Sequence, residues 1–191
     1  MNLIIATNNQ KKLKEMKAIL LKYFDSVKSL AEAGIDHETV EDGTTFEQNA
    51  LKKASEIAQI SGCAVVADDS GLVVDALGGE PGIYSARYAG GHGDDIANLN
   101  LVLEKMQGKE QRSARFVCAL AYVCGRESAV FRGEMEGLIT SAPAGENGFG
   151  YDPIFFLPEF NCTSAEISPE QKNEISHRAK AIKQLAQYLE K

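Results

Sequence analysis

Two neighbouring acids, Asp68 and Asp69, separate the apolar run that ends at Ala67 from the one that begins at Leu72. A carboxylate at the end of a buried strand can bind a metal ion or activate water, because open α/β sheets bind ligands at the carboxyl ends of their strands. Equally, one acid could cap a turn at Ser70-Gly71 while the other lies in solvent. Successive side chains of a strand point to opposite faces, so at most one of the two acids is expected to face a given site.

Polar residues and lysines follow the first apolar run of the chain. Thr7, Asn8 and Asn9 come directly after it, and Lys11 and Lys12 fall within the next turn. The N-terminus of a helix offers free N–H groups and partial positive charge, so this segment could bind phosphates. An Asn-rich turn with its lysines in solvent is the alternative. No GxxxxGK[ST] motif occurs in the sequence, which excludes a P-loop.

A glycine-rich segment carries an aromatic residue, with Gly148 and Gly150 on either side of Phe149, followed by Tyr151 and Asp152. Glycines let the backbone approach a flat ligand while the ring stacks on it. The alternative is a loop whose Phe149 side chain packs into the core. The spacing is not GxGxxG, so a dinucleotide-binding fold is not supported.

Three potential donors, Lys172, His177 and Arg178, gather around the start of the last predicted helix. Cations are unfavourable at a helix N-terminus unless an anion or a carbonyl-rich ligand lies beside them. For His177 taken alone, a purely structural role is the alternative.

The elements that must position these residues alternate between strand and helix. Apolar runs predict strands over residues 2–7, 63–69, 113–124 and 129–139. Apolar spacing of three and four predicts helices over residues 10–24, about 45–61, 95–106 and 177–190. The fold class is therefore α/β, with a mixed twisted sheet flanked by helices.

Two of the predicted helices have specific local expectations. Thr44 and Glu47 have the spacing of a capping box at the start of the second helix. In the third helix, we expect Ile96 to face inward with Leu99 and Val102.

Composition limits the class of protein. A chain of 191 residues with 44% hydrophobic residues can form one core, so a single domain is expected. The net charge of −7 argues against a broad nucleic-acid or membrane-binding surface. No apolar run approaches membrane-spanning length and no signal segment is recognised, so we expect a cytoplasmic protein. The four cysteines form no CxxC pair and are expected to be reduced.

Together these motifs resemble the inosine triphosphate pyrophosphatase family, the dITP/XTP pyrophosphatases. The resemblance extends from Leu3 to about Leu185. The matching residues are Thr7, Asn9, Lys12 and Glu15; Thr45, Phe46, Asn49, Ala50 and Lys53; Ala67 to Leu72; Pro81 to Arg87; Gly148 to Pro153; and Ser176 to Arg178.

The resemblance implies an enzyme with two lobes around a central cleft, formed by a single nucleoside triphosphate pyrophosphatase domain over residues 1–191. Such an enzyme uses Mg²⁺ to hydrolyse deaminated purine nucleoside triphosphates (ITP, dITP and XTP) to the monophosphate and pyrophosphate, which cleanses the nucleotide pool. It also implies a homodimer, with neither nucleic acid nor membrane as a partner.

The resemblance also implies roles for individual residues. Asp69 matches the proton acceptor and metal-binding acid, and Glu41 matches a second acid linked to magnesium. The residues implied to bind substrate are Thr7, Asn8, Asn9, Gln10, Lys11, Lys12, Lys53, Ser70, Phe149, Gly150, Tyr151, Asp152, Lys172, His177 and Arg178. Among these, the lysines and the Thr7 to Lys12 segment would hold phosphates, Phe149 would stack on the base, and Asp152, His177 and Arg178 would contact its edge.

Two other functions remain open at this stage. A regulatory module could bind nucleotides in the same pocket without hydrolysis, although binding alone does not require both Glu41 and Asp69. A pyrophosphatase for modified pyrimidine nucleotides is the second alternative.

Overall fold

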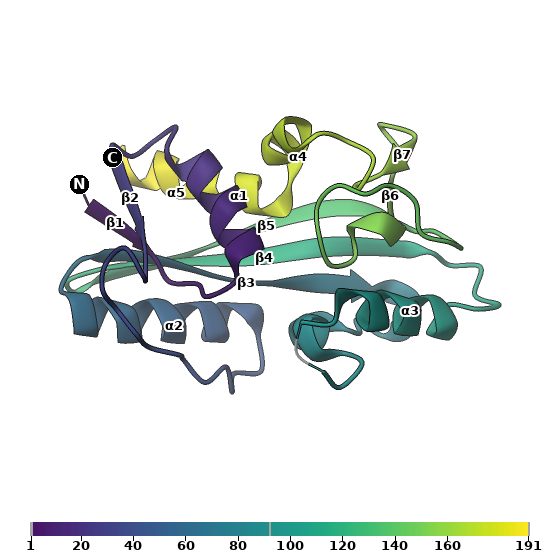
Figure 1. The fold of residues 1–191 in the computed structure, drawn as a ribbon, viewed down its shortest axis with the longest axis horizontal. Helices are drawn as coiled ribbons and strands as arrows, with labels where there is room; N and C mark the ends of the chain where they lie inside the picture. Colours follow the sequence, from purple (N-terminus) through teal and green to yellow (C-terminus); the bar gives the residue numbers. More distant parts are fainter. Residues whose placement is uncertain (1, 92, 191) are drawn as a thin grey trace. The chain divides into compact units, whose positions relative to one another are not determined.

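The computed structural model describes residues 2–91 and 93–190, and its helices and strands alternate along the chain (Figure 1). The described strands form one seven-stranded sheet in the order β2-β1-β3-β4-β5-β6-β7. The strands are β1 (Asn2–Ile5), β2 (Ser26–Ser29), β3 (Ala64–Val74), β4 (Ser113–Cys124), β5 (Glu127–Ile139), β6 (Phe155–Leu157) and β7 (Cys162–Thr163). The α-helices are α1 (Gln10–Leu20), α2 (Phe46–Ser61), α3 (Asp95–Lys105), α4 (Pro169–Ile175) and α5 (His177–Leu189). Three short 3₁₀ helices are η1 (Asp75–Leu77), η2 (Gly82–Arg87) and η3 (Asp152–Ile154).

The sheet is mixed, as the sequence predicted. Strand β1 pairs in parallel with both β2 and β3, whereas β6 pairs antiparallel with β5 and β7. Strands β4 and β5 are neighbours joined by only two residues, a connection that permits only antiparallel pairing. The α/β class and the flanking helices are thereby confirmed.

The chain divides into two compact units. The first comprises Met1–Asp69, Cys118–Gly133 and His177–Lys191, and the second comprises Ser70–Val117 and Glu134–Ser176. A single pyrophosphatase domain with two lobes around a cleft stays a prediction.

The first unit packs helices on both faces of its strands. Helix α2 lies on one face, and α1 and α5 lie on the other (Figure 1). The core on the α1 and α5 side includes Leu3 and Ile5 from β1, Met16 from α1, and Ile182 and Leu185 from α5, each at most 1% exposed. This packing fixes the positions of β1 and α1. It therefore also positions the polar residues that connect the end of β1 to the start of α1.

The second unit has a separate core. Helix α3 contributes Leu99 and Val102, and Tyr151, Ile154 and Phe155 contribute from the segment around η3 and β6. Tyr151 therefore ties the glycine-rich segment into packed structure.

One predicted helix boundary and one predicted helix cap were wrong, whereas the predicted bounds of the second helix are confirmed. The first helix ends at Leu20 instead of continuing to residue 24, because the N–H groups of Lys22 and Tyr23 bond to carbonyls three residues back, at 3.1 and 2.9 Å. Helix α2 is capped by Thr45, whose Oγ1 accepts the N–H of Gln48 at 3.2 Å, and the predicted capping box of Thr44 with Glu47 does not form.

Strand β3 does not end at the two acids, so the predicted strand boundary at residue 69 was wrong and the alternative of a turn at Ser70-Gly71 is excluded. The strand runs on to Val74. Gly71 instead permits close packing, because a Cβ there would lie 2.4 Å from both the carbonyl oxygen of Gly82 and Oγ of Ser85. Glycine at this position allows η2 to pack directly on β3.

The predicted inward face of α3 was wrong at one residue. Ile96 is 69% exposed, whereas Leu99 and Val102 are buried as expected. The buried face also includes Asn98, whose Oδ1 accepts the N–H of Ala89 at 2.8 Å. A polar side chain on the helix therefore satisfies a loop amide.

All four cysteines are free, as predicted: Cys63, Cys118, Cys124 and Cys162. Within residues 2–91 and 93–190, no helix is both long and apolar enough to cross a membrane.

Candidate functional site

The turn between β1 and α1 is stabilised by its own side chains. Oδ1 of Asn9 accepts the N–H groups of Lys11 and Lys12 at 3.0 and 3.1 Å, and Oγ1 of Thr7 accepts the N–H of Asn9 at 3.2 Å. Asn8 and Gln10 are exposed. Two helix N-terminal amides are thus already bonded within the protein, so a phosphate here would depend on the lysine side chains or on displacement of Asn9.

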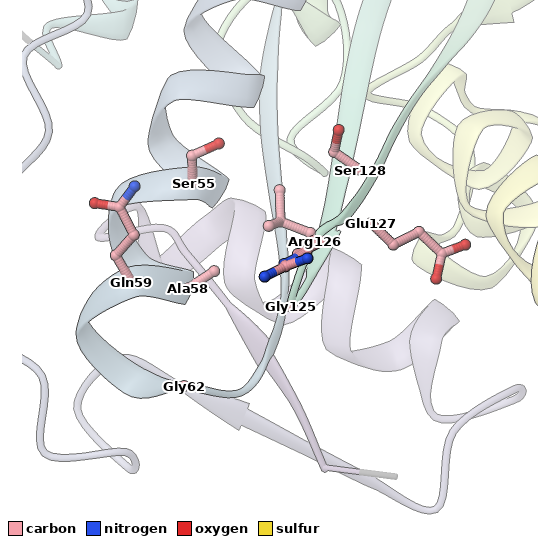
Figure 2. Close-up of a pocket in the computed structure, with 9 residues that line it drawn as sticks. Ser55, Ala58, Gln59, Gly62, Gly125, Arg126, Glu127 and Ser128 are labelled. Carbon is pink, nitrogen blue, oxygen red and sulfur yellow. The ribbon is translucent and has the colours of Figure 1, made fainter.

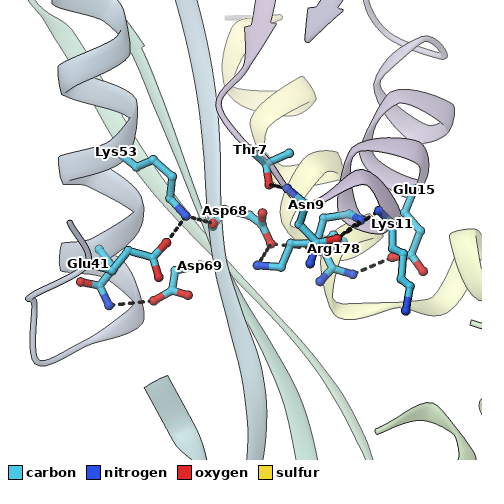
Figure 3. A network of polar contacts seen from close by, with 11 residues as sticks. Thr7, Asn9, Lys11, Glu15, Glu41, Lys53, Asp68, Asp69 and Arg178 are labelled. Carbon is cyan, nitrogen blue, oxygen red and sulfur yellow. Dashed lines mark hydrogen bonds and ion pairs between the residues drawn. The ribbon is translucent and has the colours of Figure 1, made fainter. Parts of the chain in front are cut away.

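The two adjacent acids point to opposite faces of β3, as predicted for neighbouring strand residues (Figure 3). Asp68 is completely buried on the face that also carries Arg178 and Lys12. Its Oδ2 lies 3.2 Å from Nζ of Lys12 and 3.2 Å from Nε of Arg178. Asp68 thereby forms ion pairs with two cations.

Arg178 has a second acidic partner. Its Nη1 donates to Oε2 of Glu15 at 2.6 Å, and the whole residue is 3% exposed (Figure 3). Burial alone would lower the pKa of the guanidinium, but the carboxylates of Asp68 and Glu15 raise the pKa above its usual value. The sequence analysis expected an anion or a carbonyl-rich ligand beside this cation at the start of α5, and the structure places two of the protein's own carboxylates there.

Asp69 lies on the face of β3 that α2 covers. Its Oδ2 accepts a hydrogen bond from Nδ2 of Asn49 at 2.9 Å. Burial raises the pKa of Asp69 above that of an ordinary aspartate, and the positive charge of Lys12 and the amide of Asn49 oppose that rise. A carboxylate with a raised pKa is a stronger proton acceptor than an exposed one.

Lys53 connects the second predicted metal-binding acid to β3. Its Nζ forms an ion pair with Glu41 and donates to the carbonyl oxygen of Asp68 at 3.0 Å (Figure 3). Burial acts to lower the pKa of Lys53, but the carboxylates of Glu41 and Asp68 outweigh it and raise the pKa. Glu41, Lys53 and Asp69 therefore form one electrostatically coupled cluster.

Asn49 is a site residue to which the sequence analysis assigned no role. It is 1% exposed, and its Oδ1 accepts the N–H of Gly43 at 2.8 Å while its Nδ2 donates to Asp69. Asn49 thereby links the Glu41 loop to the strand. Its position on the apolar stripe of α2, one turn after Phe46, was the available signal, since a buried amide needs polar partners.

The chemistry of this cluster suits a hard divalent cation. Among the described residues, no three His, Cys, Asp or Glu side chains come together as a metal site. Mg²⁺, however, is usually held by only one or two carboxylates plus phosphate oxygens and water. Glu41 and Asp69, which interact electrostatically with each other, would supply those two carboxylates.

The second unit holds a different polar group around Phe149. Oδ2 of Asp152 accepts the N–H of Phe149 at 2.9 Å and a hydrogen bond from Nζ of Lys172 at 2.6 Å. The same Nζ lies 4.9 Å from the centroid of the Phe149 ring. Asp152 and Lys172 are 1% and 4% exposed, whereas Phe149 is half-buried and belongs to neither core. The ring therefore retains a surface on which a flat ligand can stack.

Most of the predicted site residues, together with Glu15, Asn49 and Asp68, fall into two groups, and the exposed Asn8 and Gln10 belong to neither. The first-unit group comprises Thr7, Asn9, Lys11, Lys12, Glu15, Glu41, Asn49, Lys53, Asp68, Asp69 and Arg178. The second-unit group comprises Phe149, Gly150, Tyr151, Asp152 and Lys172. Ser70 is half-buried in β3, and His177 is buried in the first turn of α5.

A pocket of about 280 Å³ in the first unit contains none of the predicted site residues (Figure 2). It lies at the end of α2 and the β4–β5 hairpin and is lined by Ser55, Ala58, Gln59, Gly62, Val123, Gly125, Arg126, Glu127 and Ser128. Oε1 of Glu127 already accepts a hydrogen bond from the Tyr188 hydroxyl at 2.5 Å.

The fold and the two groups define an α/β protein with an acidic, lysine-rich cluster suited to a phosphorylated ligand. The sequence profile of the Ham1 family matches residues 3–188. The dITP/XTP pyrophosphatase of Bacillus subtilis (strain 168) is 52% identical over 190 residues, which cover 98% of this chain and 96% of the relative. The dITP/XTP pyrophosphatase of Listeria monocytogenes (EGD-e) is also 52% identical, over 96% of this chain and 92% of the relative. The chain belongs to the Ham1 family.

Solved structures agree with the sequence relatives. The Ham1 protein of Staphylococcus aureus superposes with a TM-score of 0.89 at 45% identity, over 100% of this chain and 98% of that one. The dITP/XTP pyrophosphatase of Mycobacterium abscessus gives a TM-score of 0.77 at 45% identity, over 97% and 98% of the two chains.

Proposed function

We propose that this protein is a nucleoside triphosphate pyrophosphatase that hydrolyses ITP, dITP and XTP to the monophosphate and pyrophosphate, and so removes deaminated purines from the nucleotide pool. The observation that carries the proposal is the cluster of Glu41, Asp69 and Lys53, with Lys12 nearby, in a chain half identical to dITP/XTP pyrophosphatases. Binding alone does not require a buried carboxylate of raised pKa beside a second acid.

The first-unit group is proposed to bind the triphosphate. A triphosphate repels an incoming nucleophile, so its charge must be neutralised before attack. Lys11, Lys12 and Lys53 would contribute positive charge, and Lys53 would exchange its ion pair with Glu41 for a phosphate oxygen. Mg²⁺ held by Glu41 and Asp69 would neutralise further charge on the phosphates.

Asp69 is proposed to accept the proton of the attacking water. The water would attack the α-phosphorus, the bond to the bridging oxygen of the β-phosphate would break, and pyrophosphate would leave as a unit. Burial favours this role, because it raises the pKa of the Asp69 carboxylate toward the operating pH.

The second-unit group is proposed to bind the base. Phe149 would stack on the purine, and the carboxylate of Asp152 would accept a hydrogen bond from N1–H of hypoxanthine or xanthine. Adenine lacks both the N1–H donor and the 6-oxo acceptor, so it would leave unmade the hydrogen bond to Asp152 and a second one donated by the protein to the 6-oxo group. Lys172 was predicted to hold phosphate, but its bond to Asp152 and its place over Phe149 favour a role beside the base.

Arg178 and His177 remain proposed base contacts. The two acids that hold Arg178 in the first unit would fix the direction of its guanidinium. A cytoplasmic location and a homodimer are also retained as predictions. Light scattering at several protein concentrations would test the oligomeric state.

The decisive experiment is a substrate panel with product identification. We expect the purified protein with Mg²⁺ to release pyrophosphate from ITP, dITP and XTP at least 100-fold more efficiently than from ATP, because two unmade hydrogen bonds cost roughly 10² to 10⁴ in kcat/KM. Hydrolysis in ¹⁸O-labelled water should label the monophosphate. Label in pyrophosphate, stepwise release of orthophosphate, or preference for a modified pyrimidine nucleotide would each contradict the proposal.

A further inference from the structure

The loop that carries Phe149 is held by two carboxylates at consecutive amides. Asp152 accepts the N–H of Phe149 at 2.9 Å, and Asp95, 55 residues away in the sequence, accepts the N–H of Gly150 at 3.0 Å through its Oδ2. The next residue, Tyr151, is tied by its hydroxyl, which donates to the carbonyl oxygen of Ser85 at 2.7 Å. Three successive residues of the loop therefore have fixed hydrogen-bond partners in the second unit.

Without such hydrogen bonds, the two glycines of this loop would make it flexible. Gly148 and Gly150, on either side of Phe149, have φ angles of +72° and +62°. Glycine adopts this region readily but also samples many other conformations. A Cβ at Gly148 would lie 2.1 Å from Oδ2 of Asp152, so a side chain cannot replace the glycine to stiffen the loop. The conformation of this loop must therefore be fixed by hydrogen bonds to other residues.

Asp95 is well placed to supply that order. It is the first residue of α3, where the positive end of the helix dipole favours a carboxylate. The helix does not depend on Asp95 for its cap, because Asp94 performs that role with Oδ1 accepting the N–H of Ala97 at 2.9 Å. Leu99 and Val102 bury α3 in the core of the second unit, and Asp95 itself is half-buried.

We propose that Asp95 is a positioning residue for base recognition: its carboxylate fixes the Gly150 amide and thereby the Phe149 ring against which the purine stacks. This inference rests on the proposed function and adds a residue that contacts neither the phosphates nor the water. Asp95 acts through the loop, so its loss should weaken nucleotide binding more than it slows the chemical step.

The adjacent acids offer a matched comparison. Asp95→Ala removes the loop bond, Asp94→Ala removes only the helix cap, and Asp95→Asn retains an oxygen that can accept from Gly150. Only Asp95→Ala removes the acceptor of the Gly150 amide, and this acceptor is a charged group, so we expect its KM for ITP to rise roughly 10- to 100-fold with kcat changed less than about threefold. Asp94→Ala should lower Tm but leave KM within about twofold, and Asp95→Asn should recover most of the wild-type KM.

Amide hydrogen exchange without nucleotide tests the inference independently of catalysis. We expect exchange at Gly150 to accelerate roughly tenfold or more in Asp95→Ala and to stay near wild type in Asp94→Ala. Should Asp95→Ala fail to fold, Asp95→Ser serves instead, because serine suits a helix N-terminus but its shorter side chain does not reach the amide.

The outcomes separate the two proposals. A wild-type protein inactive on every nucleoside triphosphate would overturn the proposed function. The amide exchange rate at Gly150 would still show whether Asp95 restrains the loop. Equal effects of Asp94→Ala and Asp95→Ala on KM, a pure kcat loss in Asp95→Ala, or unchanged Gly150 exchange in that variant would overturn the role of Asp95.

Discussion

Each of the two units contains a buried aspartate paired with a cation, but the neighbours of the two ion pairs differ. Asp68 is fully buried between Lys12 and Arg178, and Glu15 adds a second carboxylate to the same network. Asp152 pairs with Lys172, whose Nζ also lies over the Phe149 ring, and it accepts the backbone N–H of Phe149. The first arrangement concentrates charge, whereas the second presents one carboxylate beside a flat apolar surface.

This difference supports the proposed roles of the two groups. Concentrated charge suits a polyphosphate and its hydrolysis, because electrostatic stabilisation is strongest where charges are already fixed in place. An acceptor beside an aromatic ring suits a base, which offers an edge of donors and acceptors and a face for stacking. Substitution of Asp69 in the first-unit group should therefore act mainly on kcat, and substitution of Phe149 in the second-unit group should act mainly on KM.

The largest effect is expected for Asp69→Asn. Loss of the proton acceptor should lower kcat by about 10² to 10⁴ while nucleotide binding persists. The Asp68→Asn variant should lose less kcat than Asp69→Asn. Its free energy of unfolding should fall by about 3 to 5 kcal/mol, because the substitution leaves buried cations without their carboxylate. Matched kinetics and denaturant unfolding of both variants check this. A more severe kcat loss in Asp68→Asn would reverse the assignment of the two acids.

Phe149→Ala should act on KM instead. Stacking contributes about 1 to 3 kcal/mol per base, so KM should rise roughly 10- to 100-fold for ITP, XTP, GTP and ATP alike, because every purine has a face. Phe160→Ala, which removes an exposed ring of the same unit, is the control and should leave KM unchanged. A change in the ratio of ITP to ATP in Phe149→Ala would mean that the ring also selects the base.

Gly133→Ala should destabilise the first unit. A Cβ at Gly133 would lie 2.1 Å from the carbonyl oxygen of His177 and 2.8 Å from the backbone nitrogen of Ala181, so β5 contacts the backbone of α5 directly. Overpacking of this kind costs about 1 to 3 kcal/mol. Thermal unfolding should show a lower Tm than for Gly91→Ala, where a Cβ would meet no atom within 4 Å. An unchanged Tm in Gly133→Ala would show that α5 is free to shift.

The smallest effect is expected at an exposed ion pair of the first unit. The hydrogen bonds from Lys17 and from the N–H of Ser29 lower the pKa of Glu32 to about 2, from 4.5. A folded-state pKa below the unfolded one means that this stabilisation is present above pH 4.5 and is lost as pH falls toward 2. Glu32→Gln should therefore have a slightly lower Tm at pH 7 and the same Tm as wild type near pH 2. If Glu32→Gln still had a lower Tm than wild type near pH 2, the loss of stability would be due to packing and not to the ion pair.

The sequence predicted the parts of the site that follow from local spacing. Alternation along a strand correctly placed Asp68 and Asp69 on opposite faces, and the apolar runs located β4 over residues 113–124 without error. The partners of the two acids were not predictable, because Arg178 comes from a helix 110 residues away. Asp95 was missed for the same reason, since the Gly150 amide that it bonds lies 55 residues away. For Asn49, the carboxylate partner Asp69 lies 20 residues away.

Glycine was the least predictable residue. Gly71 and the acids before it indicated a turn, yet β3 continues and the glycine accommodates η2. Local propensity cannot distinguish a glycine that bends the chain from one that allows another segment to approach, because the distinction depends on tertiary contacts.

The burial of Asp69 has a practical consequence for capturing substrates. A carboxylate whose pKa is raised by burial makes the folded protein less stable when it ionises at neutral pH, so replacing it with a neutral isostere removes a cost of folding. Asparagine at this position can still accept the hydrogen bond from Asn49 through its side-chain oxygen. The Asp69→Asn protein should therefore be more heat-resistant than the wild type and should retain bound nucleotide, which makes it a reagent for drawing the natural substrate out of a cell extract.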